Sequence, residues 1–237
     1  MQHPPSANQA RISEIFSSLQ GEGIHLGERH LFIRFEECHI HCGYCDELSK
    51  VGTPMTLDQV MKEVGRLEKD EGPHSFVSLT GGEPLLYLPF LKPLMMKLKA
   101  QGFRIYLETN GILWRALEEV IGWCDSIAMD MKPASVTKEK NFDADHRCFL
   151  QIAKGKETCI KIVLSKEIDV NEFENEIRMV AEVAPATPVL LQPVSGEIEG
   201  HEDPALMDLL THLQRLGSRW LRTIRIVPRF HKILKIR

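Results

Sequence analysis

Apolar, β-rich runs alternate with amphipathic runs along most of this 237-residue chain. The predicted strands are 30–35, 75–80, 103–109, 126–130, 159–164, 188–193 and 223–227. Most of them are continuous apolar segments rather than strict alternations of apolar and polar residues, which is typical of parallel strands covered on both faces. Strand–helix alternation of this kind predicts βαβ units built around one parallel sheet.

Amphipathic stripes between these strands predict helices. The run 56–70 repeats apolar residues at helical spacing, and Thr56 with Gln59 indicates a capping box at its start. Asn171 is the expected N-cap of a later helix, and the Asp-Pro pair at 203–204 predicts the start of the last one. The stripes therefore belong to the core rather than to a cofactor-binding element.

The length and the absence of long linkers or internal repeats predict one domain. An α/β barrel commonly reaches about 200–250 residues as a single domain, and roughly six core strands fall short of the eight in a closed barrel. The expected fold is therefore α/β, a partial TIM-type barrel of parallel strands with helices outside. The expected boundaries are a flexible N-terminal tail at 1–11 and the domain at 12–237.

The net charge of −4, without a dense Lys/Arg run, argues against a polyanion binder, so no nucleic-acid partner is expected. No stretch reaches the roughly 20 apolar residues that span a bilayer, so no membrane association is expected. The first ten residues lack the apolar core of a signal peptide. We expect a cytoplasmic protein, in which thiols stay reduced and clustered cysteines favour a metal site over disulfides.

The strongest chemical signal is the spacing Cys38-x3-Cys42-x2-Cys45, directly after the first predicted strand. Loops at the carboxyl ends of parallel strands are where α/β proteins assemble sites. A [4Fe–4S] cluster normally takes four thiolates, so three leave one iron open to a further ligand. Structural zinc, with His39 or His41 as a fourth ligand, is one alternative, and incidental thiols are another.

This cysteine spacing resembles the signature of radical S-adenosylmethionine (SAM) enzymes. In that family the amino and carboxylate groups of SAM chelate the open iron. An electron from the reduced cluster then cleaves the sulfonium and gives a 5′-deoxyadenosyl radical. The segment TGGEP (80–84) resembles the family's methionine-binding element. Two glycines let a backbone approach a ligand closely, although alone the segment is typical of a simple turn.

Further motifs narrow the resemblance: SLQGEG (18–23), ETNG (108–111), DMKPAS (130–135), LQPVSG (191–196) and VPRFHKIL (227–234). Together they resemble the 7-carboxy-7-deazaguanine synthase family of queuosine and deazapurine biosynthesis. The resemblance implies a lyase that contracts the ring of 6-carboxy-5,6,7,8-tetrahydropterin to 7-carboxy-7-deazaguanine, with loss of ammonia. It also implies a [4Fe–4S] cluster, SAM, Mg²⁺, a flavodoxin- or ferredoxin-type reductant and a homodimer.

The resemblance assigns site residues position by position. The cluster ligands are Cys38, Cys42 and Cys45. The SAM-binding positions are Tyr44, Asp46, Gly82, Glu83, Glu108, Asp130, Met131, Lys132, Gln192, Pro193, Val194 and Ser195. The substrate-binding positions are Leu19, Gln20, Gly21, Arg34, Thr80, His231 and Arg237.

Three positions depart from the family's pattern. Glu47 stands where a Thr or Ser hydroxyl usually binds Mg²⁺, and a carboxylate is also a hard oxygen ligand, so both retention and loss of the ion stay open. Glu37 replaces a usual Gly before the first cysteine, and Arg229 replaces a common Gln. We expect a synthase with a modified metal shell, with a different pterin-like substrate as the fallback.

Two other functions share part of the pattern. A glycyl-radical-enzyme activase has the same cysteine spacing but gives no reason for SLQGEG. A non-catalytic iron–sulfur protein for electron transfer or sensing does not need TGGEP. Both alternatives therefore explain fewer of the motifs than the synthase does.

Overall fold

A nine-stranded sheet organises the computed structural model, which describes residues 8–45, 51–194, 203–230 and 233. Its strands are β1 (Gln9–Leu19), β2 (Arg29–Phe35), β3 (Thr53–Thr56), β4 (Phe76–Gly81), β5 (Ile105–Thr109), β6 (Ser126–Met131), β7 (Glu157–Leu164), β8 (Val189–Pro193) and β9 (Ile224–Ile226). The strand order is β3-β1-β2-β4-β5-β6-β7-β8-β9, so the described sheet is open, with β3 and β9 as its edges.

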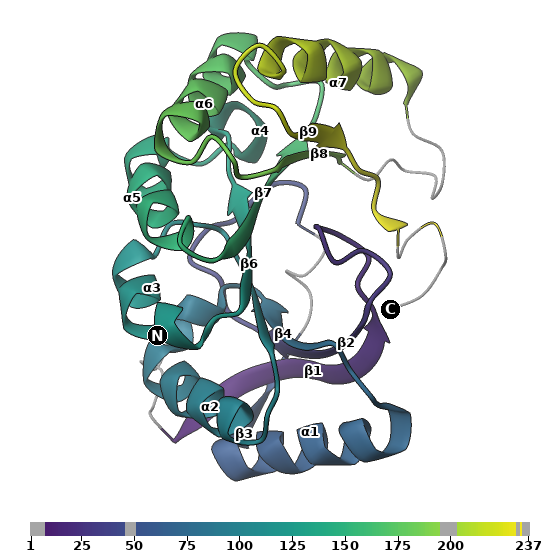
Figure 1. Ribbon diagram of the computed structural model, residues 1–237, viewed down its shortest axis with the longest axis vertical. Coiled ribbons are helices and arrows are strands. Elements are labelled where there is room, and N and C mark those ends of the chain that lie inside the picture. Colours follow the sequence, from purple (N-terminus) through teal and green to yellow (C-terminus); the bar gives the residue numbers. More distant parts are fainter. Residues whose placement is uncertain (1–7, 46–50, 195–202, 231–232, 234–237) are drawn as a thin grey trace.

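The helices follow the outer, convex side of the curved sheet (Figure 1). They are α1 (Leu57–Glu71), α2 (Leu88–Ala100), α3 (Trp114–Val120), α4 (Ala134–Thr137), α5 (Asp143–Ala153), α6 (Val170–Val183) and α7 (Pro204–Gly217), with 3₁₀ turns η1 (Pro84–Tyr87) and η2 (Ile121–Trp123). From β2 through β9 every neighbouring pair of strands is parallel. The predicted single α/β domain with a partial barrel is confirmed.

Two strands were not predicted from the sequence. β1 pairs antiparallel with β2, and β3 pairs antiparallel with β1. β1 begins at Gln9, so residues 9–11 belong to a strand rather than to the expected tail. The reason is its half-buried pattern: Ala10, Ile12 and Phe16 are buried between polar residues, unlike the continuous apolar runs of the parallel strands.

The helix ends follow the predicted caps with one exception. The capping box of α1 is present, because the Gln59 backbone N–H donates to Thr56 and the Thr56 backbone N–H donates to the Gln59 side chain. Asp203 caps α7 as expected. α6 is capped by Asp169 instead of Asn171, because the Asp169 carboxylate accepts from the Asn171 backbone N–H at 2.7 Å.

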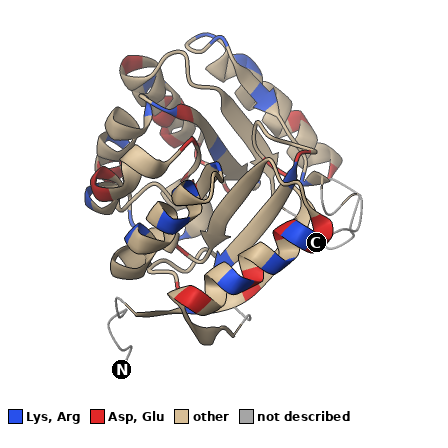
Figure 2. Ribbon diagram, turned by 60° about the horizontal axis from the view of Figure 1, so that its bottom comes forward, with Lys and Arg blue, Asp and Glu red and all other residues tan. Residues whose placement is uncertain are grey.

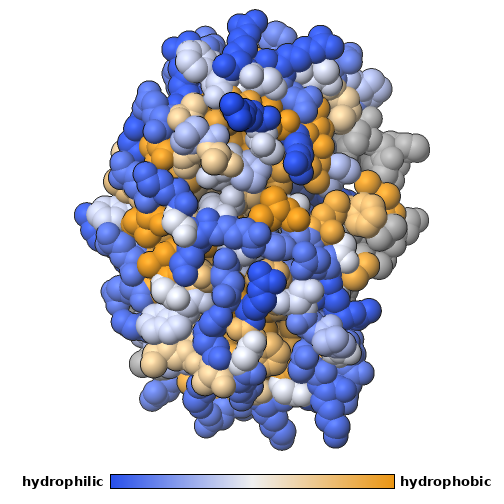
Figure 3. Space-filling view, in the orientation of Figure 1, coloured by the Kyte–Doolittle hydropathy of each residue, from blue (hydrophilic) through white to orange (hydrophobic). Residues whose placement is uncertain are grey.

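The two faces of the parallel strands differ in character. On β6, Ile127, Met129 and Met131 pack into the apolar core beneath the helices, while Ala128 and Asp130 alternate with them and face the concave side. The solvent sides of the helices carry mixed charges (Figure 2). Apolar residues show between hydrophilic ones over the face seen in Figure 3. The polar groups on the concave side of the sheet are therefore separate from the apolar core between the sheet and the helices.

The turn between β1 and β2, residues 20–28, lies near the amino-terminal ends of the parallel strands β2 and β6, and we call it the floor turn. Its ends meet where Leu19 pairs with Arg29 at the amino-terminal end of β2. His25 packs against Phe76 with ring centroids 4.5 Å apart, and its Nε2 lies 3.0 Å from Ser126 Oγ at the start of β6. No helix in the described part of the chain is long and apolar enough to cross a membrane.

Candidate active site

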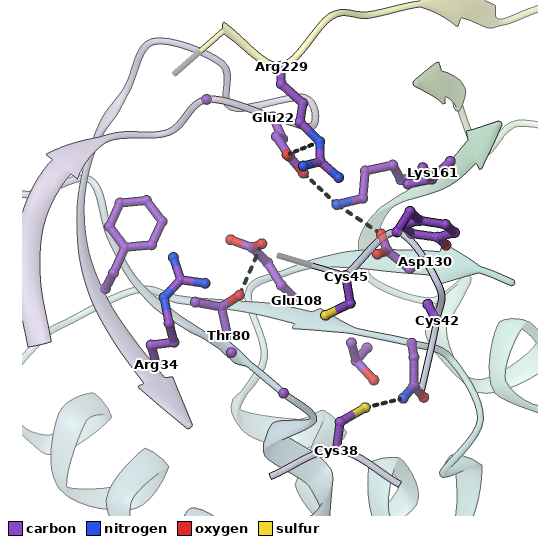
Figure 4. A pocket seen from close by; sticks show the side chains of 18 of the residues that line it. Glu22, Arg34, Cys38, Cys42, Cys45, Thr80, Glu108, Asp130, Lys161 and Arg229 are labelled. Carbon is purple, nitrogen blue, oxygen red and sulfur yellow. Dashed lines mark hydrogen bonds and ion pairs between the residues drawn. The ribbon is translucent and has the colours of Figure 1, made fainter. Parts of the chain in front are cut away.

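A cavity lies on the concave side of the sheet, and the floor turn forms one of its walls (Figure 4). The predicted site residues that line it are Leu19, Gln20, Gly21, Arg34, Cys38, Cys42, Tyr44, Cys45, Thr80, Gly82, Glu108, Asp130 and Lys132. Further lining residues, not predicted as site residues, are Phe16, Glu22, Phe32, Ile40, Gly81, Thr109, Asn110, Lys161, Val163 and Arg229. Segments far apart in the sequence thus meet around one space.

The TGGEP segment supports the start of the cysteine loop through its backbone. Gly82 N donates to Phe35 O at 2.8 Å, and Glu83 N donates to Glu37 O at 2.7 Å. A Cβ on Gly82 would lie 2.1 Å from Glu37 O, far inside contact distance. Gly82 therefore permits the chain to approach itself at this edge, in addition to lining the cavity.

The cysteine loop lies in an apolar cluster that includes Ile40, Ile112 and Phe142. Burial raises the pKa of the thiols of Cys38 and Cys42. Metal binding requires thiolates, so loading of this site releases protons. The surrounding apolar side chains limit the access of water to Cys42 and partly to Cys38, whereas Cys45 is exposed. Solvent access of this kind is a known control on the properties of a metal centre.

The donor set fits an iron–sulfur cluster better than a single metal ion. All three cysteines line one cavity, yet within the described ranges no three His, Cys, Asp or Glu side chains converge on one ion. Thiolates of a [4Fe–4S] cluster bind different irons and so surround a volume, whereas zinc ligands meet at one point. Neither His39 nor His41 is among the residues lining the cavity.

Asn110 from the ETNG motif adds a polar contact to this group. Its Nδ2 atom lies 3.8 Å from Cys38 Sγ, within the range of a weak hydrogen bond to sulfur (Figure 4). Hydrogen bonds to cluster sulfurs are among the features that set a cluster's potential. The motif was recognised from the sequence, but Asn110 itself was not assigned to the site.

Glu83, predicted to contact SAM, is not among the residues that line the described cavity. Its side chain is 0% exposed, and its carboxylate accepts from Leu85 N, Asn110 N and Thr109 Oγ1 at 2.8–3.0 Å. Burial raises the pKa of Glu83 to about 7. The carboxylate lies behind the cavity wall and joins the ends of β4 and β5, because donors of its own chain surround it.

Several other predicted SAM contacts do not line the described cavity. Met131 belongs to the apolar core on the outer face of β6, because side chains alternate along a strand and its neighbours Asp130 and Lys132 face inward. Gln192, Pro193 and Val194 are also not part of the lining. The predicted positions Asp46, Glu47, Ser195, His231 and Arg237 lie outside the described residues.

Glu108 lies among residues predicted to bind the substrate. Its Oε1 accepts from Gln20 Nε2 at 3.0 Å, and its Oε2 accepts from Thr80 Oγ1 at 3.2 Å (Figure 4). Burial raises the pKa of Glu108, while the Lys161 cation and the Gln20 donor oppose that effect. This geometry groups Glu108 with Gln20 and Thr80 rather than with the cysteine loop.

Arg34 projects from the end of β2 toward the cavity. Its Nε lies 3.5 Å from Glu14 Oε2, and its guanidinium carbon lies 5.7 Å from the centre of the Phe16 ring. Phe16 in turn stacks on Phe32, with ring centroids 4.9 Å apart and an interplanar angle of 10°. The planar cation is therefore held beside an aromatic pair at the cavity wall.

An ion network that the sequence did not predict crosses the cavity (Figure 4). Lys161 Nζ lies 2.5 Å from Glu22 Oε2 and 3.1 Å from Asp130 Oδ1. Asp130 also pairs with Lys132 at 2.9 Å, and Glu22 lies 3.6 Å from Arg229 Nε. The available signal was a lysine in the middle of the otherwise apolar strand CIKIVL.

The amino-acid sequence is similar to that of known proteins. The family model "Radical SAM superfamily" matches residues 32–180. The 7-carboxy-7-deazaguanine synthase of Geobacter sulfurreducens is 34% identical, over 95% of this chain and 97% of the relative. The synthase of Archaeoglobus fulgidus is 31% identical, over 97% of this chain and 100% of the relative.

Solved structures share the fold. The crystal structure of QueE from Escherichia coli gives a TM-score of 0.61 at 21% identity, covering 94% of this chain and 95% of that chain. A structure of TYW1 with a lysine–pyruvate adduct gives 0.55 at 17% identity, covering 81% and 74%. At these identities the likeness concerns the architecture.

Proposed function

Because the chain belongs to the radical SAM superfamily, and within it to the 7-carboxy-7-deazaguanine synthase family, we propose that it contracts the ring of 6-carboxy-5,6,7,8-tetrahydropterin to 7-carboxy-7-deazaguanine. The observation that carries the proposal is one cavity that joins the three cysteines to the floor turn, Thr80 and Glu108. A non-catalytic iron–sulfur protein gives no reason for the second, polar half of this cavity.

The radical SAM family implies a [4Fe–4S] cluster and SAM, and the cysteine loop suits them. We assign Cys38, Cys42 and Cys45 as the cluster ligands, with SAM between the loop and the ends of β5 and β6. When bound, the cluster and SAM supply the chemistry that removes a hydrogen atom from the substrate. Tyr44 and Lys132 border this side, with the Lys132 Nζ 5.6 Å from the centre of the Tyr44 ring.

The chain's own polar groups orient the pterin. Pterins present neighbouring N–H donors, which the carboxyl group of Glu108 can accept, while Gln20 and Thr80 keep that group in place. Arg34 offers planar donors to the substrate carboxylate or ring carbonyl. The floor turn closes one side of the cavity and so limits the access of water to the reacting ring.

Further parts of the proposal concern features beyond the described geometry. We assign Glu47 as the neighbour of a Mg²⁺ ion that engages the substrate carboxylate. Ser195, Asp46, His231 and Arg237 keep their assignments from the family pattern. A cytoplasmic homodimer that takes electrons from a flavodoxin- or ferredoxin-type protein completes the proposal.

Anaerobic reconstitution followed by mass spectrometry tests the function. With the carboxy-tetrahydropterin, SAM and a chemical reductant, the protein should form 7-carboxy-7-deazaguanine and ammonia. Cys42→Ala should bind less iron and release no 5′-deoxyadenosine. A wild-type protein that cleaves SAM but leaves the pterin unchanged would refute the substrate, and a radical on a partner polypeptide would favour the activase.

A further inference from the structure

Lys161 is a largely buried cation within the otherwise apolar segment CIKIVL of β7. On β7, Ile160, Ile162 and Leu164 pack beneath the helices, whereas Cys159, Lys161 and Val163 face the concave side. A lone lysine in this position would be unfavourable without compensating charges. Its placement therefore requires partners inside the cavity.

Two carboxylates from different parts of the fold supply that compensation. Asp130 is the register neighbour of Lys161 on β6, so their side chains lie next to each other on the same face. Glu22 reaches the same ammonium group from the floor turn. The side chains of Lys161, Glu22 and Asp130 are only 12%, 18% and 20% exposed, so solvent weakens these ion pairs little.

The network connects the two halves of the proposed site. From Asp130 it continues to Lys132, beside Tyr44 of the cysteine loop. From Glu22 it continues to Gln20, whose Oε1 accepts from the Glu22 backbone N–H at 3.1 Å. Gln20 then donates to Glu108. Lys161 is thus one of the residues that join the barrel wall to the floor turn, and it lies between the two carboxylates.

We propose that Lys161 is a positioning residue of this site, whose ammonium group fixes the Asp130 carboxylate of the wall and the Glu22 carboxylate of the floor turn relative to each other. This inference rests on the proposed function, because it treats the floor side as the pterin side and the wall side as the SAM side. Lys161 itself attacks no carbonyl, since both carboxylates hold it in the charged form and raise its pKa despite burial.

The test uses two substitutions and a matched control. Lys161→Met removes the charge but keeps a similar length, and Lys161→Arg keeps the charge. Lys99→Met is the control, because Lys99 also pairs with an aspartate, Asp125 at 2.8 Å, but on α2 outside the cavity. Each variant is reconstituted with its cluster and loaded with SAM.

The first measurement is equilibrium binding of the carboxy-tetrahydropterin to unreduced enzyme, in which no turnover occurs. Lys161→Met should bind the pterin about tenfold more weakly or worse, because small displacements of positioning groups have large effects. Lys161→Arg should recover part of the affinity, and Lys99→Met should retain it. After reduction, Lys161→Met should release more 5′-deoxyadenosine per ring-contracted product than the wild type, a change that a loss of stability alone does not cause.

Unchanged pterin affinity and an unchanged ratio of 5′-deoxyadenosine to product in Lys161→Met would overturn the proposal. An equal loss in Lys99→Met would do so as well, because the effect would then be one of general stability. Should Lys161→Met fail to fold, the double variant Lys161→Met/Glu22→Gln leaves one carboxylate fewer without a cation. Wild-type pterin affinity in that variant would also overturn it.

Failure of the proposed function has a separate signature. In that case the wild-type protein binds and cleaves SAM but neither binds nor converts the pterin. Lys161 is then judged by SAM affinity, which Lys161→Met should weaken because Asp130 loses one of its two cations. Unchanged SAM affinity in this situation would reject the positioning role.

Discussion

At the scale of single residues, Arg34 stands between a carboxylate, an aromatic pair and the cavity. Glu14 and Phe16 limit the orientations of its guanidinium group, so little rotamer freedom remains to be lost on binding. Neither contact involves the cysteine loop. A change at Arg34 should therefore separate binding of the substrate from assembly of the cluster.

Arg34→Ala should leave iron content and SAM cleavage intact but raise the substrate KM. The expected rise is about tenfold or more, since a hydrogen bond to a charged group contributes about 1.5–3 kcal/mol. Steady-state kinetics under anaerobic conditions measure it. Arg104→Ala is the matched control, because that guanidinium also lies over an aromatic ring, Phe76, but does not line the cavity. Unaltered kinetics in Arg34→Ala would place the pterin elsewhere.

At the scale of elements, the end of β4 and the start of the cysteine loop depend on each other. Backbone hydrogen bonds from Gly82 and Glu83 hold the loop where β2 ends. Gly81 adopts φ +121°, a conformation that only glycine takes readily. The TGGEP turn is therefore a support for the cysteine loop as well as part of the cavity.

Gly82→Ala should weaken this support. The added Cβ would overlap Glu37 O, and overpacking of this kind typically costs about 1–3 kcal/mol. We expect a lower melting temperature and a lower iron content after reconstitution, measured by thermal unfolding and iron assay. Gly43→Ala is the control, since it lies inside the cysteine loop but a Cβ there meets no atom within 4 Å. Equal iron content in both variants would contradict the supporting role.

The elements also show what the sequence could and could not predict. Continuous apolar runs identified the seven parallel strands, because both faces of each strand are covered. β1 escaped prediction because it is antiparallel, half-buried and irregular between Ile12 and Glu14. The motifs identified the cysteines, Thr80 and Glu108, which line one cavity. A motif does not specify, however, on which face of a strand each side chain lies. Met131 and Glu83 do not line the cavity for that reason, and the sequence alone does not place Lys161 beside Glu22.

At the scale of the whole molecule, the interior near the amino-terminal ends of the strands contains histidine and aromatic side chains together with a few aliphatic ones. His30 is 0% exposed, its Nδ1 lies 2.8 Å from Ser78 Oγ, and its ring packs near Phe76 and Tyr106. Burial, with the neighbouring His25, lowers the pKa of His30 to about 4. The folded state thus holds this imidazole in its neutral form.

His30 should make the folded state less stable in mild acid. Its pKa falls from 6.5 to about 4 on folding, so between these values the unfolded chain binds more protons. The contribution of His30 to stability is complete above about pH 6.5 and is lost as the pH falls toward 4. Urea unfolding at pH 7.5 and pH 5 should show a smaller drop for His30→Gln than for the wild type. His212→Gln, at an exposed position on α7, should keep the wild-type drop; a matching drop in His30→Gln would contradict the assignment.

The floor turn also touches the opposite end of the chain. Phe230 N donates to Gly21 O at 3.0 Å, Arg229 approaches Glu22, and Ile24 packs in the same cluster as Val227. The described sheet is open, so its first and last parts are not joined by a strand ladder. Here the floor turn, which follows β1, contacts the segment that follows β9. A ligand bound in the cavity next to Gln20 is therefore linked through the floor turn to residues 227–230. A spectroscopic label at Phe230, which does not line the cavity, would report whether the cavity is occupied.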